Sequence, residues 1–240
     1  MISSFIQPIV GTGALEFAFS RATTECKFTL LALLILSFLS WTIIISKSRQ
    51  LFVASRQTRK FLAQYGQNVD PLKVNRDQVA LGAAPAFQVF CRGAGETERL
   101  LLQSPVAGQK RINEQGFELI KTVLEETTTT EAINLERGMI ILSIAVAGGP
   151  FIGLLGTVWG VMETFSGIAQ ANAATLTAMA PGVAAALIAT VAGLLVAIPA
   201  MFAYNLMVTS IRHITQELDA FAARFATQIR FYYMKEPPVS

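Results

Sequence analysis

Three apolar runs, each long enough to cross a lipid bilayer, constrain this chain more than any other feature. They cover residues 28–46, 139–168 and 176–208. A membrane-spanning helix needs roughly 20 apolar residues, because each residue adds about 1.5 Å and the hydrocarbon core is about 30 Å thick. The composition agrees, since 52% of the 240 residues are hydrophobic and only 15% are charged. The chain is therefore expected to be an all-α membrane protein with three transmembrane helices.

Lys and Arg are distributed unevenly around these runs. Arg21 and Lys27 alone precede the first run, and none lies in residues 139–208; the other 17 of the 19 lie in residues 47–138 and 209–240. Because basic residues remain on the cytoplasmic side, these two segments are predicted to be cytoplasmic. Residues 1–27 and the loop 169–175 are then predicted to lie on the opposite side. The basic cluster Lys47–Lys60 is interpreted as an anchor near anionic lipid.

Both cytoplasmic segments carry apolar residues at helical spacing, which predicts long helical extensions. In residues 110–137 the pattern predicts a helix that runs directly into the second span, although the β-branched stretch Thr127–Thr130 weakens it. In residues 209–240 the pattern predicts a continuation of the third span that ends before Pro237.

Several functional classes lack support in the sequence. A pI near 9.0 does not indicate nucleic-acid binding, because the basic residues form no single run and no recognition motif accompanies them. No nucleophile–base pair, phosphate loop or carboxylate dyad occurs, so we expect no catalytic residue and no enzyme activity. His213 is the only histidine, and without a Cys/His cluster we expect no metal site and no cofactor.

Two stretches rich in small residues carry one hydroxyl each. Gly149–Gly160 contains Thr157, and Ala180–Leu194 contains Thr190. Small residues allow membrane helices to approach closely, and a hydroxyl from each of two packed helices suits the wall of a narrow ion path. The alternative, in which each buried hydroxyl only bonds the carbonyl four residues earlier, remains open.

Other small or polar residues share the spacing of these two threonines. Gly153, Gly160 and Thr164 lie four residues before, three after and seven after Thr157, on one helix face. In the third run, small residues recur every four positions and form a stripe: Ala185, Ala189, Gly193 and Ala197. This stripe predicts packing against another helix, with a neighbouring subunit as one possibility.

Two prolines and one acidic residue complete the candidate site. Pro181 and Pro199 mark kinks or helix starts, which bundled membrane helices tolerate. Glu163 lies six residues beyond Thr157, about 9 Å further along the helix. In a ring of subunits it would give a negatively charged mouth that concentrates cations; the alternative is a solvated interfacial charge.

Ser40–Ile45, Pro150–Met162 and Ala180–Asn205 resemble the TolQ/ExbB/MotA family of inner-membrane motor subunits. The resemblance is closest to the TolQ and ExbB branch and covers nearly the whole chain. It implies a bacterial inner-membrane protein with a periplasmic N-terminus and a cytoplasmic C-terminus. It also implies a pentameric ring around two copies of an ExbD- or TolR-like single-span partner, whose membrane Asp carries H⁺ or Na⁺. Thr157 and Thr190 match the polar lining of the family.

One departure from the family pattern affects the expected coupling ion. The TolQ and ExbB branch usually carries a Glu where this chain has Ala185, and residues 176–208 contain no acidic residue. Proton coupling would then depend on the partner's carboxylate, whereas hydroxyl oxygens beside it could hold Na⁺. Two functions remain open: an ion-conducting stator, and a structural scaffold of the same family without ion coupling. A self-contained channel has less support, because the spans offer no charged selectivity element.

Overall fold

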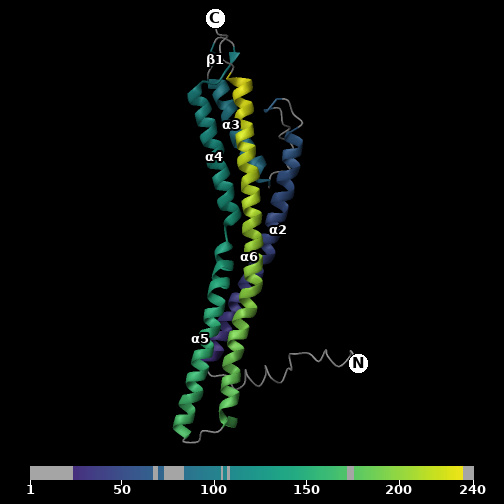
Figure 1. Cartoon of the computed structure of the whole chain (residues 1–240). Helices are drawn as coiled ribbons and strands as arrows, with labels where there is room; N and C mark the ends of the chain where they lie inside the picture. The colour runs from purple at the N-terminus through teal and green to yellow at the C-terminus, as the bar shows by residue number, and fades with distance from the viewer. Residues whose placement is uncertain are drawn as a thin grey trace, which may run out of the picture. The chain divides into compact units, whose positions relative to one another are not determined.

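The structure, a computed structural model, describes residues 24–66, 70–72, 84–103, 105–106, 109–171 and 176–234. The helices in these residues are α2 (Thr24–Tyr65), α3 (Pro85–Gln103), α4 (Glu114–Glu136), α5 (Met139–Ala171) and α6 (Leu176–Tyr233) (Figure 1). The strands β1 (Pro105–Val106) and β2 (Gln109–Lys110) form a two-residue antiparallel ladder between α3 and α4 in the sequence. The predicted all-α fold is confirmed apart from this hairpin.

Three of the helices are long and apolar enough to cross a membrane, as the hydropathy pattern predicts. The segments that meet this criterion are Glu25–Tyr65, Met139–Ala169 and Gly182–Tyr233. Helix α6 continues without interruption from its apolar half into the tail and ends at Tyr233. The predictions for residues 1–23, for 172–175 and for Pro237 fall outside the described residues.

The chain forms two compact units, which we describe separately. The first comprises Met1–Ile45 and Gly138–Asn205, and therefore contains the apolar parts of α2, α5 and α6. The second comprises Ser46–Arg137 and Leu206–Ser240, and contains α3, α4 and the polar ends of α2 and α6.

The prediction of one continuous helix from residue 110 into the second span is wrong. Helix α4 ends at Glu136, α5 begins at Met139, and Gly138 between them has a φ of 87°. A left-handed backbone at this position favours glycine and is a common way for a helix to end. The threonine run, by contrast, is helical throughout. Three of its hydroxyls, those of Thr127, Thr129 and Thr130, donate to the carbonyl four residues earlier.

The end of α4 is capped by Lys47 of α2, a role that the sequence did not predict. The Lys47 side chain is only 6% exposed. Its Nζ donates to the Leu135 carbonyl at 2.9 Å and the Asn134 carbonyl at 3.4 Å, and to Gln50 Oε1 at 2.9 Å. The last carbonyls of a helix have no intrahelical donor, and a cation is favourable at this end of the helix dipole. Lys47 is thus a helix cap within the second unit.

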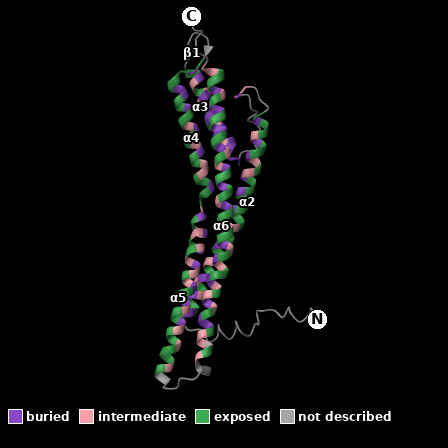
Figure 2. Cartoon of the chain, viewed as in Figure 1, coloured by how far each residue is buried: buried purple, intermediate pink, exposed green. Residues whose placement is uncertain are grey.

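Aromatic side chains from three helices form the core of the second unit. Phe61 of α2 is 1% exposed, and its ring centroid lies 5.7 Å from Phe90 of α3 and 5.5 Å from Phe221 of α6. Tyr65, one turn further along α2, packs 5.0 Å from Phe221 and donates a hydrogen bond to Gln228. Figure 2 shows buried residues recurring along α3 and along the C-terminal half of α6.

Replacing Phe61 with alanine should lower the free energy of unfolding of the second unit by about 3 kcal/mol, since burial is lost and a cavity forms. The matched control is Phe52→Ala on the same helix, where the ring is 69% exposed and the loss should be below about 0.5 kcal/mol. Denaturant unfolding followed by circular dichroism measures both. Equal losses for the two variants would contradict this core.

Candidate ion-conduction site

Helices α5 and α6 of the first unit lie side by side (Figure 1), and glycines occupy the positions where they contact each other. A Cβ built on Gly153 would lie 2.8 Å from the Ala189 carbonyl oxygen and 3.1 Å from Thr190 Cα. A Cβ built on Gly193 would lie 3.1 Å from Gly153 Cα. Such distances are shorter than the 3.5–4.0 Å optimum between carbon atoms. The glycines therefore allow the two backbones to come into direct contact.

The same close packing continues toward the loop end of the two helices. A Cβ on Gly160 would lie 2.8 Å from the Ala186 side chain. A Cβ on Gly156 would lie 2.7 Å from the Ala189 side chain and 2.8 Å from Thr29 Oγ1 of α2. Steps of three or four residues on α5 are matched by equal steps backward on α6, so the two helices are antiparallel.

The predicted stripe on the third span is buried inside the chain itself. Ala185, Ala189, Gly193 and Ala197 are all buried. Glycines of α5 contact Ala189, Gly193 and Ala197. Cys26 of α2 packs with Ala189, and its thiol donates to the Ala185 carbonyl. The sequence left a neighbouring subunit open as the packing partner, whereas the structure supplies partners from the same chain.

Thr157 and Thr190 lie side by side where the glycines bring the helices together. Their hydroxyls are hydrogen-bonded to each other. Thr157 Oγ1 also lies 3.2 Å from the Gly153 carbonyl and 3.2 Å from the Ala186 carbonyl, and Thr190 Oγ1 lies 3.3 Å from the Gly153 carbonyl. Both side chains are half-buried. The predicted pair is thus brought together across two helices, which a bond to the own-helix carbonyl alone would not require.

This arrangement places four oxygen atoms from two helices in one cluster. The two hydroxyls can donate one proton each, while each retains acceptor capacity. The cluster can therefore exchange hydrogen-bond partners, accept bonds from water, or turn oxygen lone pairs toward a cation. Hydroxyls do not titrate near neutral pH, so the pair alone cannot carry a proton as a charged group.

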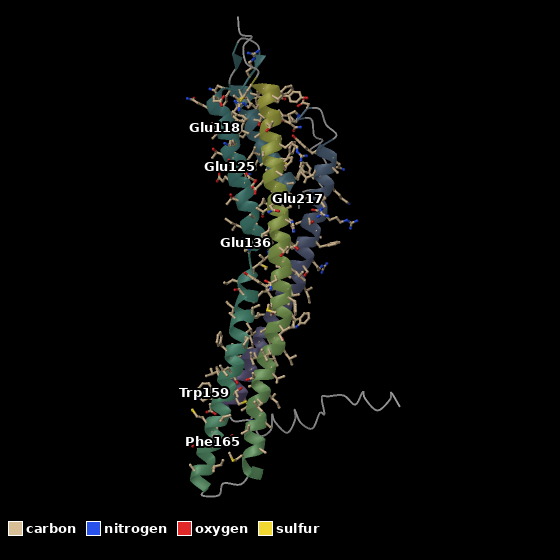
Figure 3. All side chains as sticks on the ribbon, in the orientation of Figure 1. Glu118, Glu125, Glu136, Trp159, Phe165 and Glu217 are labelled. Carbon is tan, nitrogen blue, oxygen red and sulfur yellow. The ribbon has the colours of Figure 1, made fainter. Side chains whose placement is uncertain are left out.

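Two other predicted site residues, Thr164 and Glu163, are not hydrogen-bonded to this pair. Thr164 donates to the carbonyl of Gly160 on its own helix at 2.7 Å and packs against Gly182 of α6. Glu163 is exposed, and its position on the helix is about 120° from Thr157. Pro199 is half-buried within α6. Pro181 also belongs to α6, and its side chain is not among those that the structure describes. Large apolar residues of α5, including Trp159 and Phe165, are exposed (Figure 3).

No carboxylate joins the hydroxyl pair from the third span, because residues 176–208 contain no Asp or Glu. Within the described ranges there is also no group of three or more His, Cys, Asp or Glu residues that could hold a metal ion. At this site the third span thus supplies uncharged oxygens alone.

Comparisons with known proteins match most of the chain. Residues 94–220 match the family described as the MotA/TolQ/ExbB proton channel family. The Tol-Pal system protein TolQ of Haemophilus influenzae is 34% identical over 211 residues, which cover 87% of this chain and 90% of the relative. TolQ of Pseudomonas aeruginosa is 32% identical over 78% of this chain and 79% of the relative. The biopolymer transport protein ExbB of Pseudomonas putida is 32% identical over 80% of this chain, which spans 56% of that relative.

Proposed function

Because the chain belongs to the MotA/TolQ/ExbB proton channel family, we propose that it is the ion-conducting stator subunit of an inner-membrane energy-coupling motor. The observation that carries this proposal is the Thr157–Thr190 pair, which places two hydroxyls from different spans in one oxygen cluster. A scaffold without ion coupling has no evident need for hydroxyls at this point. Glu163 is proposed to lie at the periplasmic mouth, where an exposed carboxylate attracts cations.

The proposed assembly is a homo-oligomeric ring, pentameric as in the family, around two copies of a single-span partner that resembles ExbD or TolR. Support for a partner comes from the chain itself, since its third span carries no acidic residue. A carboxylate is the natural proton carrier inside a membrane, so the partner would supply a membrane Asp. The N-terminus would be periplasmic and the C-terminus cytoplasmic, in agreement with the distribution of Lys and Arg. Work would be delivered to the periplasm or outer membrane.

Protons are the proposed coupling ion, because the family is described as a proton channel family. Sodium is the second candidate, and it is favoured by one observation: Thr157, Thr190 and the carbonyls of Gly153 and Ala186 form a cluster made only of uncharged oxygens. Backbone carbonyl oxygens are known to coordinate Na⁺ in membrane proteins.

Reconstitution with the partner tests both parts of this proposal. Proteoliposomes that hold the complex should move protons under a pH gradient in Na⁺-free medium. Replacing the partner's membrane Asp with Asn should stop this flux, because the charged carrier is lost. Flux under a Na⁺ gradient alone would select sodium, and the absence of flux under both gradients would favour the scaffold.

A further inference from the structure

A groove on the second unit runs between α2 and α4, beside the start of α3. It has a volume of about 450 Å³. Ser46, Arg49 and Gln50 line it from α2, and Glu131 and Asn134 line it from α4. The two walls are connected by the buried Lys47, which donates hydrogen bonds to Gln50 and to the Asn134 and Leu135 carbonyls.

The groove presents one positive and one negative side chain that do not neutralise each other. Ion pairs in the described parts of the chain include Arg59–Glu217, Arg99–Glu96 and Lys121–Glu118, and the structure records none for Arg49 or Glu131. Burial raises the pKa of the half-buried Glu131, and a hydrogen bond with Asn134 partly offsets this effect. Arg49 retains five N–H donors and Glu131 retains acceptor capacity. Both charges are therefore available to a ligand.

The sequence places both walls of the groove where the spans leave the membrane. Ser46 is the last residue of the first apolar run, and Arg49 follows about 4.5 Å further along α2. On the other wall, Asn134 precedes Met139, the first residue of α5, by five residues, two of which lie in the break between α4 and α5. The lipid headgroup layer on each side of a bilayer is about 5–8 Å thick. From these sequence distances we expect the groove at the depth of the headgroups.

We propose that this groove binds the headgroup of a zwitterionic phospholipid with a primary ammonium group. Its phosphate would bind Arg49, because a guanidinium matches phosphate with two parallel hydrogen bonds. Its ammonium would donate to the Glu131 carboxylate. A phosphatidylglycerol headgroup would present only uncharged hydroxyls to Glu131, and a trimethylated ammonium has no N–H to donate.

Lipid titration of the purified full-length chain tests this assignment. The delipidated protein is mixed in detergent with phosphatidylethanolamine, phosphatidylcholine or phosphatidylglycerol that carry identical acyl chains, and bound lipid is counted by native mass spectrometry. We expect phosphatidylethanolamine to bind about tenfold more tightly than phosphatidylcholine, the difference that one charge-assisted hydrogen bond supplies.

Substitutions of the two charged residues should weaken lipid binding in different ways. Arg49→Gln should weaken both zwitterionic lipids about tenfold, since both carry the phosphate. Glu131→Gln should weaken phosphatidylethanolamine alone and so remove its preference, whereas Glu131→Asp should keep the preference. The controls are Arg212→Gln on α6 and Glu136→Gln at the end of α4 (Figure 3), which are exposed and do not line the groove. Neither control should alter binding.

Two outcomes would overturn the proposal. One is equal binding of phosphatidylethanolamine and phosphatidylcholine by the unaltered chain. The other is strongest binding of phosphatidylglycerol with equal weakening by Arg49→Gln and Arg212→Gln, which would show general attraction of basic residues to anionic lipid. Thermal unfolding of each variant identifies any substitution that acts by unfolding the second unit, and in that case Glu131→Asp decides the assignment of the ammonium.

Discussion

Replacing Thr157 and Thr190 together with valine will reduce ion flux through the reconstituted complex by at least about tenfold. The two hydroxyls bond to each other and to the carbonyls of Gly153 and Ala186. Valine keeps the branched shape but removes both hydroxyl oxygens, so an ion or water at this point loses two of four polar contacts. Each such contact contributes about 1 kcal/mol, and about 1.4 kcal/mol of added barrier slows a step tenfold.

Serine and a third threonine provide the controls for this experiment. Thr157→Ser with Thr190→Ser keeps both hydroxyls and should keep most of the flux. Thr164→Val should also keep it, because the Thr164 hydroxyl bonds to the Gly160 carbonyl of its own helix and not to the pair. Proton flux is measured with a pH-sensitive dye inside proteoliposomes. Full flux of the double valine variant, with normal assembly, would remove the pair from the ion path and favour the scaffold.

The three spans and the tail could be predicted from the sequence because their signal is local. A run such as residues 176–208 contains no charged residue, and this property survives in any arrangement of the helices. The continuation of α6 to Tyr233 followed from apolar residues at helical spacing. The small residues at Gly153 and Gly193 likewise indicated close packing before any partner was known.

Neither the break between α4 and α5 nor the Lys47 cap at the end of α4 could be predicted, because each depends on contacts distant in sequence. A single glycine inside a helical pattern is compatible with an uninterrupted helix, and only the structure shows Gly138 at a φ of 87°. Lys47 reads as one member of a basic cluster, yet it bonds to carbonyls 87 and 88 residues away. No periodicity links such positions.

The sequence predicted the residues of the site but not how they contact one another. A lone hydroxyl in each glycine- and alanine-rich stretch singled out Thr157 and Thr190, whereas Thr164 shared the same helical face and was grouped with them. The structure separates them because Thr164 is opposite Gly182, which offers no hydroxyl. The sequence also could not identify the helix that packs against the stripe of small residues on α6. A spacing of four residues fits a helix of the same chain or of another copy.

Gly193→Leu should cause the largest loss of stability in the first unit. A side chain at this position would meet the Gly149 carbonyl oxygen at 2.5 Å and Gly153 Cα at 3.1 Å, so α5 and α6 would have to separate along their contact. Overpacking in a tight core typically costs about 1–3 kcal/mol, occasionally more. Backbone contacts leave no flexible side chain to yield here, so we expect at least about 3 kcal/mol and little folded protein.

Gly167→Leu on α5 is the matched control, because a Cβ at Gly167 would have no atom within 4 Å. Leucine favours a helix over glycine by up to about 1 kcal/mol, so this control should be neutral or slightly stabilising, and only Gly193→Leu should lower the unfolding temperature. Thermal unfolding in detergent measures the stability, and native mass spectrometry measures the subunit number. If Gly193→Leu kept the stability of the subunit and lost only the oligomer, the stripe would have to face another copy. The packing of α5 against α6 described above would then be incorrect, because a leucine cannot enter it without moving the Gly149 and Gly153 backbone.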